Sequence, residues 1–236
     1  MVIGVQTLRC PAKHRPRPHR HTGGLNIRHA SDTLTIRPPI LYFGTPVVLI
    51  TTRNEDGSAN ITPMSSAWAL ADRVVIGLSG GGQGLVNLLR ERECVLNLAA
   101  DSMHAAVERI APTSGRDPVP TWKHEAGYRH EADKFALAGF HALPSIKVAA
   151  PRIAECPLQL ESRVTHHADR PLDDWRGNAG GFAIIELEVL HVHAHADIVV
   201  PGTQHIDPTR YSPLFYVFRH YVGRGETLGK TFKAQV

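Results

Sequence analysis

The chain has 236 residues, 42% of them hydrophobic, so it can bury a substantial core, and a large β-barrel of this length can form one domain. Its 26 Lys and Arg residues exceed its 22 Asp and Glu residues, but six of these cations and no acid lie in residues 1–30. The rest of the chain therefore has 20 cations against 22 acids, which excludes a basic nucleic-acid platform on the folded part. Without an apolar run of about 18 residues or a signal-type N-terminus, we expect a cytoplasmic protein with no membrane span.

Residues 1–33 are rich in Pro, Arg and His, as in KHRPRPHRHTGG, and lack apolar periodicity, so we expect a flexible basic arm. Contact of this arm with phosphate or a metal is an alternative. Residues 34–236 are predicted to form a single domain. The three cysteines are far apart and lack CxxC spacing, which predicts buried thiols rather than disulfides or a zinc site: Cys10, Cys94 and Cys156.

The first strands are predicted from β-branched runs separated by turn residues. PVVLITT begins at Pro46, and Asn54–Gly57 is typical of a hairpin turn. The segment Asn60–Trp68 and, after a turn, VVIGLS are predicted as further antiparallel neighbours. A glycine-rich loop then leads into a predicted helix over residues 85–92, and CVLNLA predicts the next strand.

The second half of the chain begins with a predicted helix over residues 102–110. Residues 111–134 form a long excursion containing Pro and Trp, which is typical of a lid or a dimer arm. Strands are predicted at 145–155 and at 157–168, the latter with its apolar residues at even positions and its polar residues at odd ones.

The last long strand is predicted from Phe182 to about His195. Its apolar residues switch from odd to even positions, which predicts a β-bulge near Val189 and Leu190. After the bulge the alternate histidines share a face with two glutamates, so we expect surface histidines rather than a metal site: His191, His193 and His195. Short strands, few helices and no βαβ alternation favour an antiparallel barrel.

Two glycine-rich stretches do not match nucleotide-binding motifs. In GRGETLGKT, five residues separate Gly223 from Gly229 where a P-loop requires four, and too few residues follow for a helix. LSGGGQG has Leu85 where a GxGxxG motif requires glycine. No GxSxG elbow occurs, so nucleophilic hydrolysis is not indicated.

The segment Asn60–Trp68 carries hydroxyls and an aromatic residue where a buried strand would carry Val and Ile. Together with the loop at residues 79–87, whose amides lead into a helix beginning near Gly84, it has the groups needed to hold a phosphate and a polar ring edge. Ser and Thr on an ordinary exposed strand are the alternative.

Five stretches occur in a characteristic order: PVVLITTRNEDGSANITPMSSAWAL, VVIGLS, GLVNLLRERECVLNLA, DKFALAGFHALPSIKVAAPRIAECPLQLESRV and FRHYVGRGETLGKTF. With them the chain resembles the flavin reductase-like proteins of the FMN-binding split-barrel family over roughly residues 42–232. The resemblance implies a mainly β fold, a six-stranded antiparallel split β-barrel with a few short peripheral helices. It also implies a homodimer with FMN near the subunit interface.

In such proteins the segment matching Asn60–Trp68 follows the flavin, and the loop matching Ser79–Asn87 receives its phosphate. The implied cofactor-binding residues are Asn60, Ile61, Thr62, Pro63, Met64, Ser65, Ser66, Trp68, Ser79, Gly82, Gln83, Gly84, Asn87, Tyr221 and Arg224. The implied catalytic residue is His220, at a position that approaches the flavin or the nicotinamide. Because the loop lacks a basic residue, we expect weak FMN binding or charge supplied by Arg53, Arg90 or Arg224.

The resemblance implies hydride transfer from NAD(P)H to flavin, a reaction that needs little acid–base chemistry from the protein. Reduced flavin would pass to free flavin, a partner oxygenase or oxygen. The alternatives are a non-catalytic FMN-binding electron carrier and a flavin-dependent oxygenase with its own small organic substrate. A haem protein is a further alternative, for which only His220 is placed as an axial ligand.

Overall fold

The computed structural model describes residues 33–170, 181–229 and 231. The chain divides into two compact units, Met1–Pro39 and Ile40–Val236. In the first unit, the described residues 33–39 contain no helix or strand. The predicted arm over residues 1–33 and Cys10 fall almost wholly outside the described ranges, so the predicted domain boundary stays a prediction.

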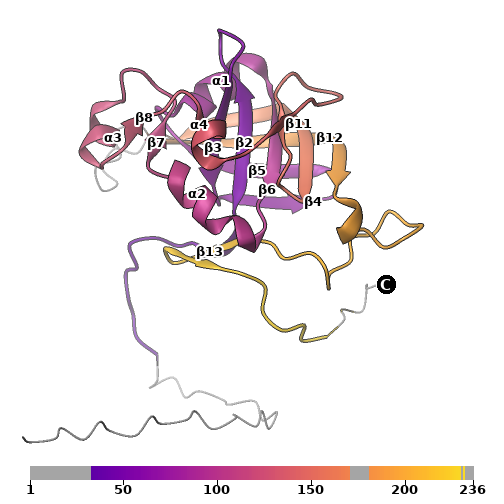
Figure 1. Cartoon of the computed structure of the whole chain (residues 1–236). Helices are drawn as coiled ribbons and strands as arrows, with labels where there is room; N and C mark the ends of the chain where they lie inside the picture. Colours follow the sequence, from indigo (N-terminus) through magenta and orange to yellow (C-terminus); the bar gives the residue numbers. More distant parts are fainter. Residues whose placement is uncertain (1–32, 171–180, 230, 232–236) are drawn as a thin grey trace, which may run out of the picture. The chain divides into compact units, whose positions relative to one another are not determined.

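A seven-stranded antiparallel sheet dominates the second unit, in the order β3-β2-β6-β11-β12-β5-β4 (Figure 1). Its strands are β2 (Val48–Arg53), β3 (Ala59–Met64), β4 (Ala67–Leu70), β5 (Arg73–Ser79), β6 (Glu93–Leu98), β11 (Leu158–Arg170) and β12 (Phe182–Ala194). The mainly β, antiparallel prediction is confirmed. The sheet has seven strands where the resemblance implied six, and closure into a split barrel stays a prediction.

The predicted continuous strand Asn60–Trp68 is in fact two strands at opposite edges of this sheet. β3 ends at Met64 and β4 begins at Ala67, so only Ser65 and Ser66 connect them. The two edges therefore meet at this corner, where the amide of Gly77 donates to the carbonyl of Ser66 over 2.8 Å. Both predicted antiparallel pairings are present, since β3 pairs with β2 and β4 pairs with β5, but the middle partner is two strands and not one.

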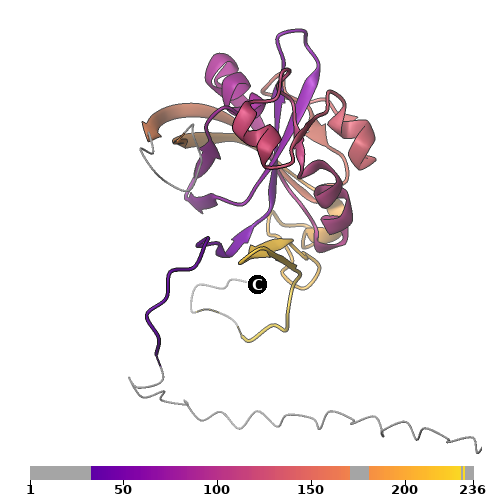
Figure 2. The same ribbon diagram turned by 90° about the vertical axis from the view of Figure 1, so that its left-hand side faces the viewer.

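Short elements surround the main sheet. The strands are β1 (Phe43–Pro46), β7 (Thr113–Ser114), β8 (Arg129–His130), β9 (Ala142–Leu143), β10 (Arg152–Ile153), β13 (Phe215–Val217) and β14 (His220–Val222); the helices are α1 (Gln83–Glu91), η2 (Asp101–Met103), α2 (His104–Ile110), α3 (Thr121–Glu125), α4 (Lys134–Ala138) and η3 (Ala196–Ile198). Figures 1 and 2 show α2 between the β7–α3–β8–α4 segment and the β13–β14 hairpin. None of the helices in the described ranges has the length and apolar character that a bilayer crossing needs.

Two hydrophobic clusters lie on opposite faces of β2, which explains its continuous apolar sequence. Leu49 belongs to a cluster with residues of α2 and α4, whereas Ile50 belongs to a cluster with β5, β6 and β12. Cys94 and Cys156 are fully buried free thiols, as predicted. Burial raises the pKa of both thiols well above the usual range.

The predicted bulge in β12 is confirmed, since Glu161 pairs with His191 and Ser162 with Val189, which leaves Leu190 without an opposite residue. The predicted strand at 145–155 is reduced to β10, Arg152–Ile153. Instead, the amides of Ile146 and Lys147 donate to the carboxylate of Glu161.

The alternation predicted for β11 does not separate a buried apolar face from an exposed polar one. The segment before β11 covers the face that carries the polar residues. Gln159 and Glu161 are both buried, and Gln159 donates to the carbonyls of Ile153 and Cys156. His193 is likewise not a surface residue: its side chain is 16% exposed and its Nε2 lies 2.6 Å from Glu161 Oε1. Among the described residues no cluster of His, Cys, Asp or Glu could hold a metal.

Candidate functional site

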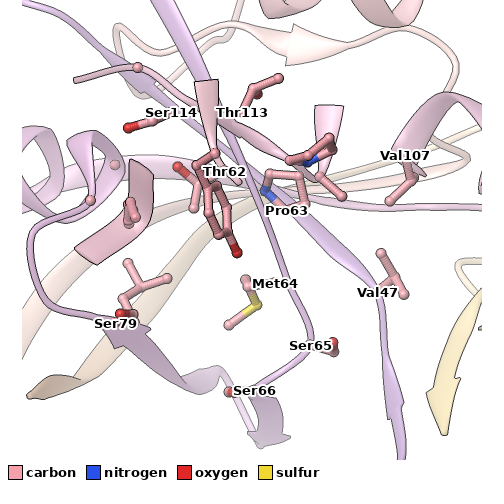
Figure 3. A pocket seen from close by; sticks show the side chains of 18 of the residues that line it. Val47, Thr62, Pro63, Met64, Ser65, Ser66, Ser79, Val107, Thr113 and Ser114 are labelled. Atoms are coloured by element: carbon pink, nitrogen blue, oxygen red, sulfur yellow. The ribbon is translucent and has the colours of Figure 1, made fainter. Parts of the chain in front are cut away.

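A cavity of about 670 Å³ opens at the corner between β3 and β4. Figure 3 shows Thr62, Pro63, Met64, Ser65 and Ser66 following one another along it. Ten of the predicted site residues line it: Thr62, Pro63, Met64, Ser65, Ser66, Ser79, Gly82, Gln83, Gly84 and Tyr221. Residues far apart in sequence thus form one cavity, whose size is that of a cofactor site.

Other predicted residues support the cavity without lining it. Asn60 is buried and donates from Nδ2 to the hydroxyl of Thr62 over 3.1 Å. Ile61 points into the core below, as the alternation of β3 requires. Asn87 is buried in α1, where its Nδ2 donates to Thr52 and Asn54.

The structure does not bring three further predicted residues into the cavity wall. Trp68 is 59% exposed on β4. His220 is exposed at the start of β14, with Nδ1 3.1 Å from the carbonyl of Phe218. Arg224 donates to the carbonyl of Pro208 over 2.7 Å. Their roles stay predictions.

The N-terminus of α1 faces the cavity through Gly82, Gln83, Gly84 and Leu85. Its first turn carries no acidic side chain and no side-chain cap, so its amides are available to an anion. A Cβ at Gly84 would overlap the side chain of Thr62. Glycine at this position therefore allows the helix to approach β3 closely.

Lys123, on α3, is a cation close to this glycine loop. Its Nζ lies 3.3 Å from the position that a Cβ of Gly82 would occupy, and 5.3 Å and 5.6 Å from the ring centroids of Trp122 and Tyr128. Burial lowers its pKa, and repulsion by Arg116 lowers it further. Arg53, Arg90 and Arg224, the predicted sources of charge, do not line the cavity; Arg90 contacts Glu91 and the carbonyl of Arg53.

Lys134, on α4, is a second cation in the cavity wall. The residue is only 4% exposed, and its Nζ donates to the carbonyl of Ile61 over 2.8 Å. Burial lowers the pKa of Lys134 from 10.5 to about 8, with a further lowering by Lys123 and an opposing effect of Glu131. Neither lysine was identified from the sequence, although both belong to the excursion at residues 111–134 that was predicted as a lid or a dimer arm.

Tyrosines form another part of the cavity wall. Tyr42 Oη lies 2.8 Å from Ser66 Oγ, and the ring of Tyr216 lies between those of Tyr42 and Tyr221 at centroid distances of 5.4 Å and 5.8 Å. Tyr221 donates from Oη to Glu108 Oε2 over 3.0 Å. Burial and this carboxylate raise the pKa of Tyr221 well above its usual value. His220, the ligand considered for a haem protein, does not belong to the described residues of the cavity wall.

Two sequence relatives cover most of the chain. An uncharacterized protein, YdfE, of Bacillus subtilis (strain 168) is 42% identical over 200 residues, which cover 85% of this chain and 93% of that protein. An uncharacterized protein of Methanothermobacter thermautotrophicus is 26% identical over 73% of this chain and 74% of that protein.

Solved structures share the fold. Flavoredoxin of Desulfovibrio vulgaris (Miyazaki F) superposes with a TM-score of 0.66 at 18% identity, covering 88% of this chain and 99% of that one. Nitrilotriacetate monooxygenase component B of Bacillus cereus gives 0.64 at 16% identity, with coverages of 84% and 100%. The model of the flavin reductase like domain matches residues 40–224, so the chain belongs to the flavin reductase-like family.

Proposed function

We propose that the protein binds FMN in the cavity at the β3–β4 corner and transfers hydride from NAD(P)H to flavin. The observation that carries this proposal is a pair of lysines in the cavity wall, buried Lys134 and half-buried Lys123, beside a glycine loop and a helix N-terminus. A buried cation is costly unless a negative group neutralises it. Neither lysine has a carboxylate partner among the described residues. A phosphate ester is the group that this arrangement would stabilise.

The rest of the cavity fits the other parts of a flavin. The hydroxyls of Thr62, Ser65 and Ser66 follow one wall, where ribityl and ring oxygens would find hydrogen-bond donors. Met64 and Tyr216 give the wall an apolar surface. A bound flavin would supply the hydride acceptor, and the protein would hold the donor and acceptor in line and exclude water.

Several finer features of the proposal come from the family. We propose a split barrel closed at the Ser65–Ser66 corner and a homodimer in which exposed Trp68 and His220 approach the flavin site. Cytoplasmic location is part of the same proposal. Delivery of reduced flavin to a partner oxygenase is supported by the structural likeness to a protein named nitrilotriacetate monooxygenase component B.

An anaerobic titration tests the function. The protein is loaded with FMN, freed of excess ligand, and mixed with NADH or NADPH while the flavin absorbance is followed. Retained FMN that bleaches within seconds supports the reductase. Retained FMN that neither nucleotide reduces would favour the carrier or an oxygenase instead, and failure to retain or bind FMN would overturn the assignment of the cavity.

A further inference from the structure

A shallow hollow that is largely open to solvent, the second cavity below, adjoins the proposed flavin cavity. Glu108, Arg219 and Tyr221 line both cavities, so the two share a wall. His104, Ala105 and Arg109 complete the second one. It is therefore placed to hold the remote part of a molecule whose reactive end enters the first cavity.

The charges of this second cavity favour an anion. The carboxylate of Glu108 already accepts a hydrogen bond from Tyr221, and the guanidinium of Arg109 donates to the carbonyls of Leu137 and Ala138. Arg219 is different: in the part of the chain that the structure describes, its guanidinium has no hydrogen-bond or ion-pair partner. It lies close enough to Tyr216 to oppose the rise in the pKa of that phenol that burial causes.

The backbone at Arg219 is also unusual. Val217 pairs with His220, so Phe218 and Arg219 are the two turn residues of the β13–β14 hairpin. Both have positive φ angles, 43° and 72°. Two-residue turns of this kind normally use Asn-Gly, because other side chains are disfavoured there. Arginine in this left-handed conformation is a backbone outlier that motivates a functional hypothesis for its side chain.

We propose that Arg219 binds a phosphate group of the pyridine nucleotide, which lies in the second cavity while its dihydronicotinamide reaches the flavin past Tyr221. This inference rests on the proposed function. In the reaction, the hydride carries two electrons and one proton from the dihydronicotinamide to the flavin and leaves the oxidised nucleotide. Arg219 takes no part in that transfer; it is a binding residue for the donor.

The experiment measures stopped-flow reduction of the FMN-loaded protein by NADH, by NADPH and by 1-benzyl-1,4-dihydronicotinamide, a hydride donor without phosphate. The variants are Arg219→Gly and Arg219→Lys. Glycine suits the positive φ, so Arg219→Gly keeps or raises the unfolding temperature while it removes the guanidinium. Arg163→Ala is the matched control, because Arg163 is an exposed arginine that pairs with Glu188 and lines neither cavity.

We expect Arg219→Gly to weaken the apparent Kd of a phosphate-bearing donor about tenfold or more, which is the loss of one charge-assisted contact. Arg219→Lys should recover part of the loss, and the benzyl donor should react with all variants at the same rate. A loss of affinity confined to NADPH identifies the 2′-phosphate as the group that Arg219 binds. An equal loss for NADH and NADPH identifies the diphosphate as that group, and both results support the proposal.

Two results would overturn it. Unchanged Kd values for both nucleotides in Arg219→Gly exclude the role of Arg219 but leave the reductase intact. An equal loss with the benzyl donor shows that the change disturbs the flavin site rather than a phosphate contact. If the wild-type protein retains FMN but neither nucleotide reduces it, the proposed function fails, and the nucleotide site with it.

Discussion

The ammonium group of Lys134 donates a 2.8 Å hydrogen bond to the carbonyl of Ile61 and thereby joins α4 to β3 at the base of the cavity. This contact satisfies one hydrogen of the ammonium group but does not neutralise its charge. Lys123 lies in the same wall and repels it. The cavity is thus prepared for an anion before any ligand enters.

Replacement of Lys134 by Met should weaken FMN binding by about ten- to a hundredfold, since a charge-assisted contact contributes roughly 1.5–3 kcal/mol. Riboflavin, which lacks the phosphate, should bind both proteins equally. Kd values from the quenching of flavin fluorescence check this. Lys147→Met is the matched control, because Lys147 is exposed and outside the cavity wall. Equal losses for FMN and riboflavin would show that Lys134 has only a structural role.

The lowered pKa of Lys134 predicts opposite pH effects on stability and on binding. Between pH 8 and 10.5 the unfolded chain keeps a proton that the folded, ligand-free protein has lost, so the free energy of unfolding should rise with pH in this window. FMN affinity should fall over the same range as the ammonium group deprotonates. Urea unfolding and FMN titrations from pH 7.5 to 9.5 measure both slopes. If Lys134→Met shows the wild-type slopes, another group is responsible.

Replacement of Gly84 by Ala should disrupt the site, because the new Cβ overlaps the side chain of Thr62. Overpacking of this kind costs ~1–3 kcal/mol, against a gain of up to ~1 kcal/mol from helix propensity. We expect a lower unfolding temperature and weaker FMN binding. Gly225→Ala is the control, because no heavy atom lies within 4 Å of its added Cβ. Wild-type behaviour of Gly84→Ala would mean that α1 does not need its close approach to β3.

Replacement of Ser65 and Ser66 by Ala tests the corner at which the sheet edges meet. Each change removes a hydroxyl from the cavity wall, and the second also removes the partner of Tyr42. We expect the double variant to lose about tenfold in FMN affinity, as for one or two neutral hydrogen bonds. Ser102→Ala, at an exposed position in η2, should bind FMN like the wild type. Unchanged FMN retention by the double variant would exclude these hydroxyls from the site.

Replacement of Glu161 by Gln should destabilise the protein by roughly 2 kcal/mol, because a buried hydrogen-bonded charge is removed from its donors. The carboxylate accepts from the amides of Ile146 and Lys147 and from His193. Burial opposes the ionised form, but these donors outweigh it and hold the pKa of Glu161 below its usual value. Hydrogen exchange at residues 146 and 147 should accelerate in the variant. Protection equal to that of the wild type would show that the carboxylate does not hold this segment.

Local sequence patterns were sufficient to predict the features that depend on residues close together in the chain. The β-bulge at Leu190 follows from a parity switch within one strand, and α1 follows from a glycine loop before an apolar stripe. The buried state of Cys94 and Cys156 follows from their type and spacing. The polar segment from Thr62 to Ser66 drew attention in the sequence and lines the cavity, but Ser and Thr also suit an exposed strand, so the pattern alone left both interpretations open.

Tertiary structure decided the features that depend on distant residues. The break of the polar segment into β3 and β4 arises because the sheet edges meet at Ser65 and Ser66, which no local pattern encodes. Glu161 is buried beneath Ile146 and Lys147, and Gln159 beneath residues 152–156, which lie outside β11 in the sequence. The charge of the site comes from Lys123 and Lys134 because α3 and α4 fold back over the glycine loop and β3, and this long-range packing places two cations where the loop itself has none.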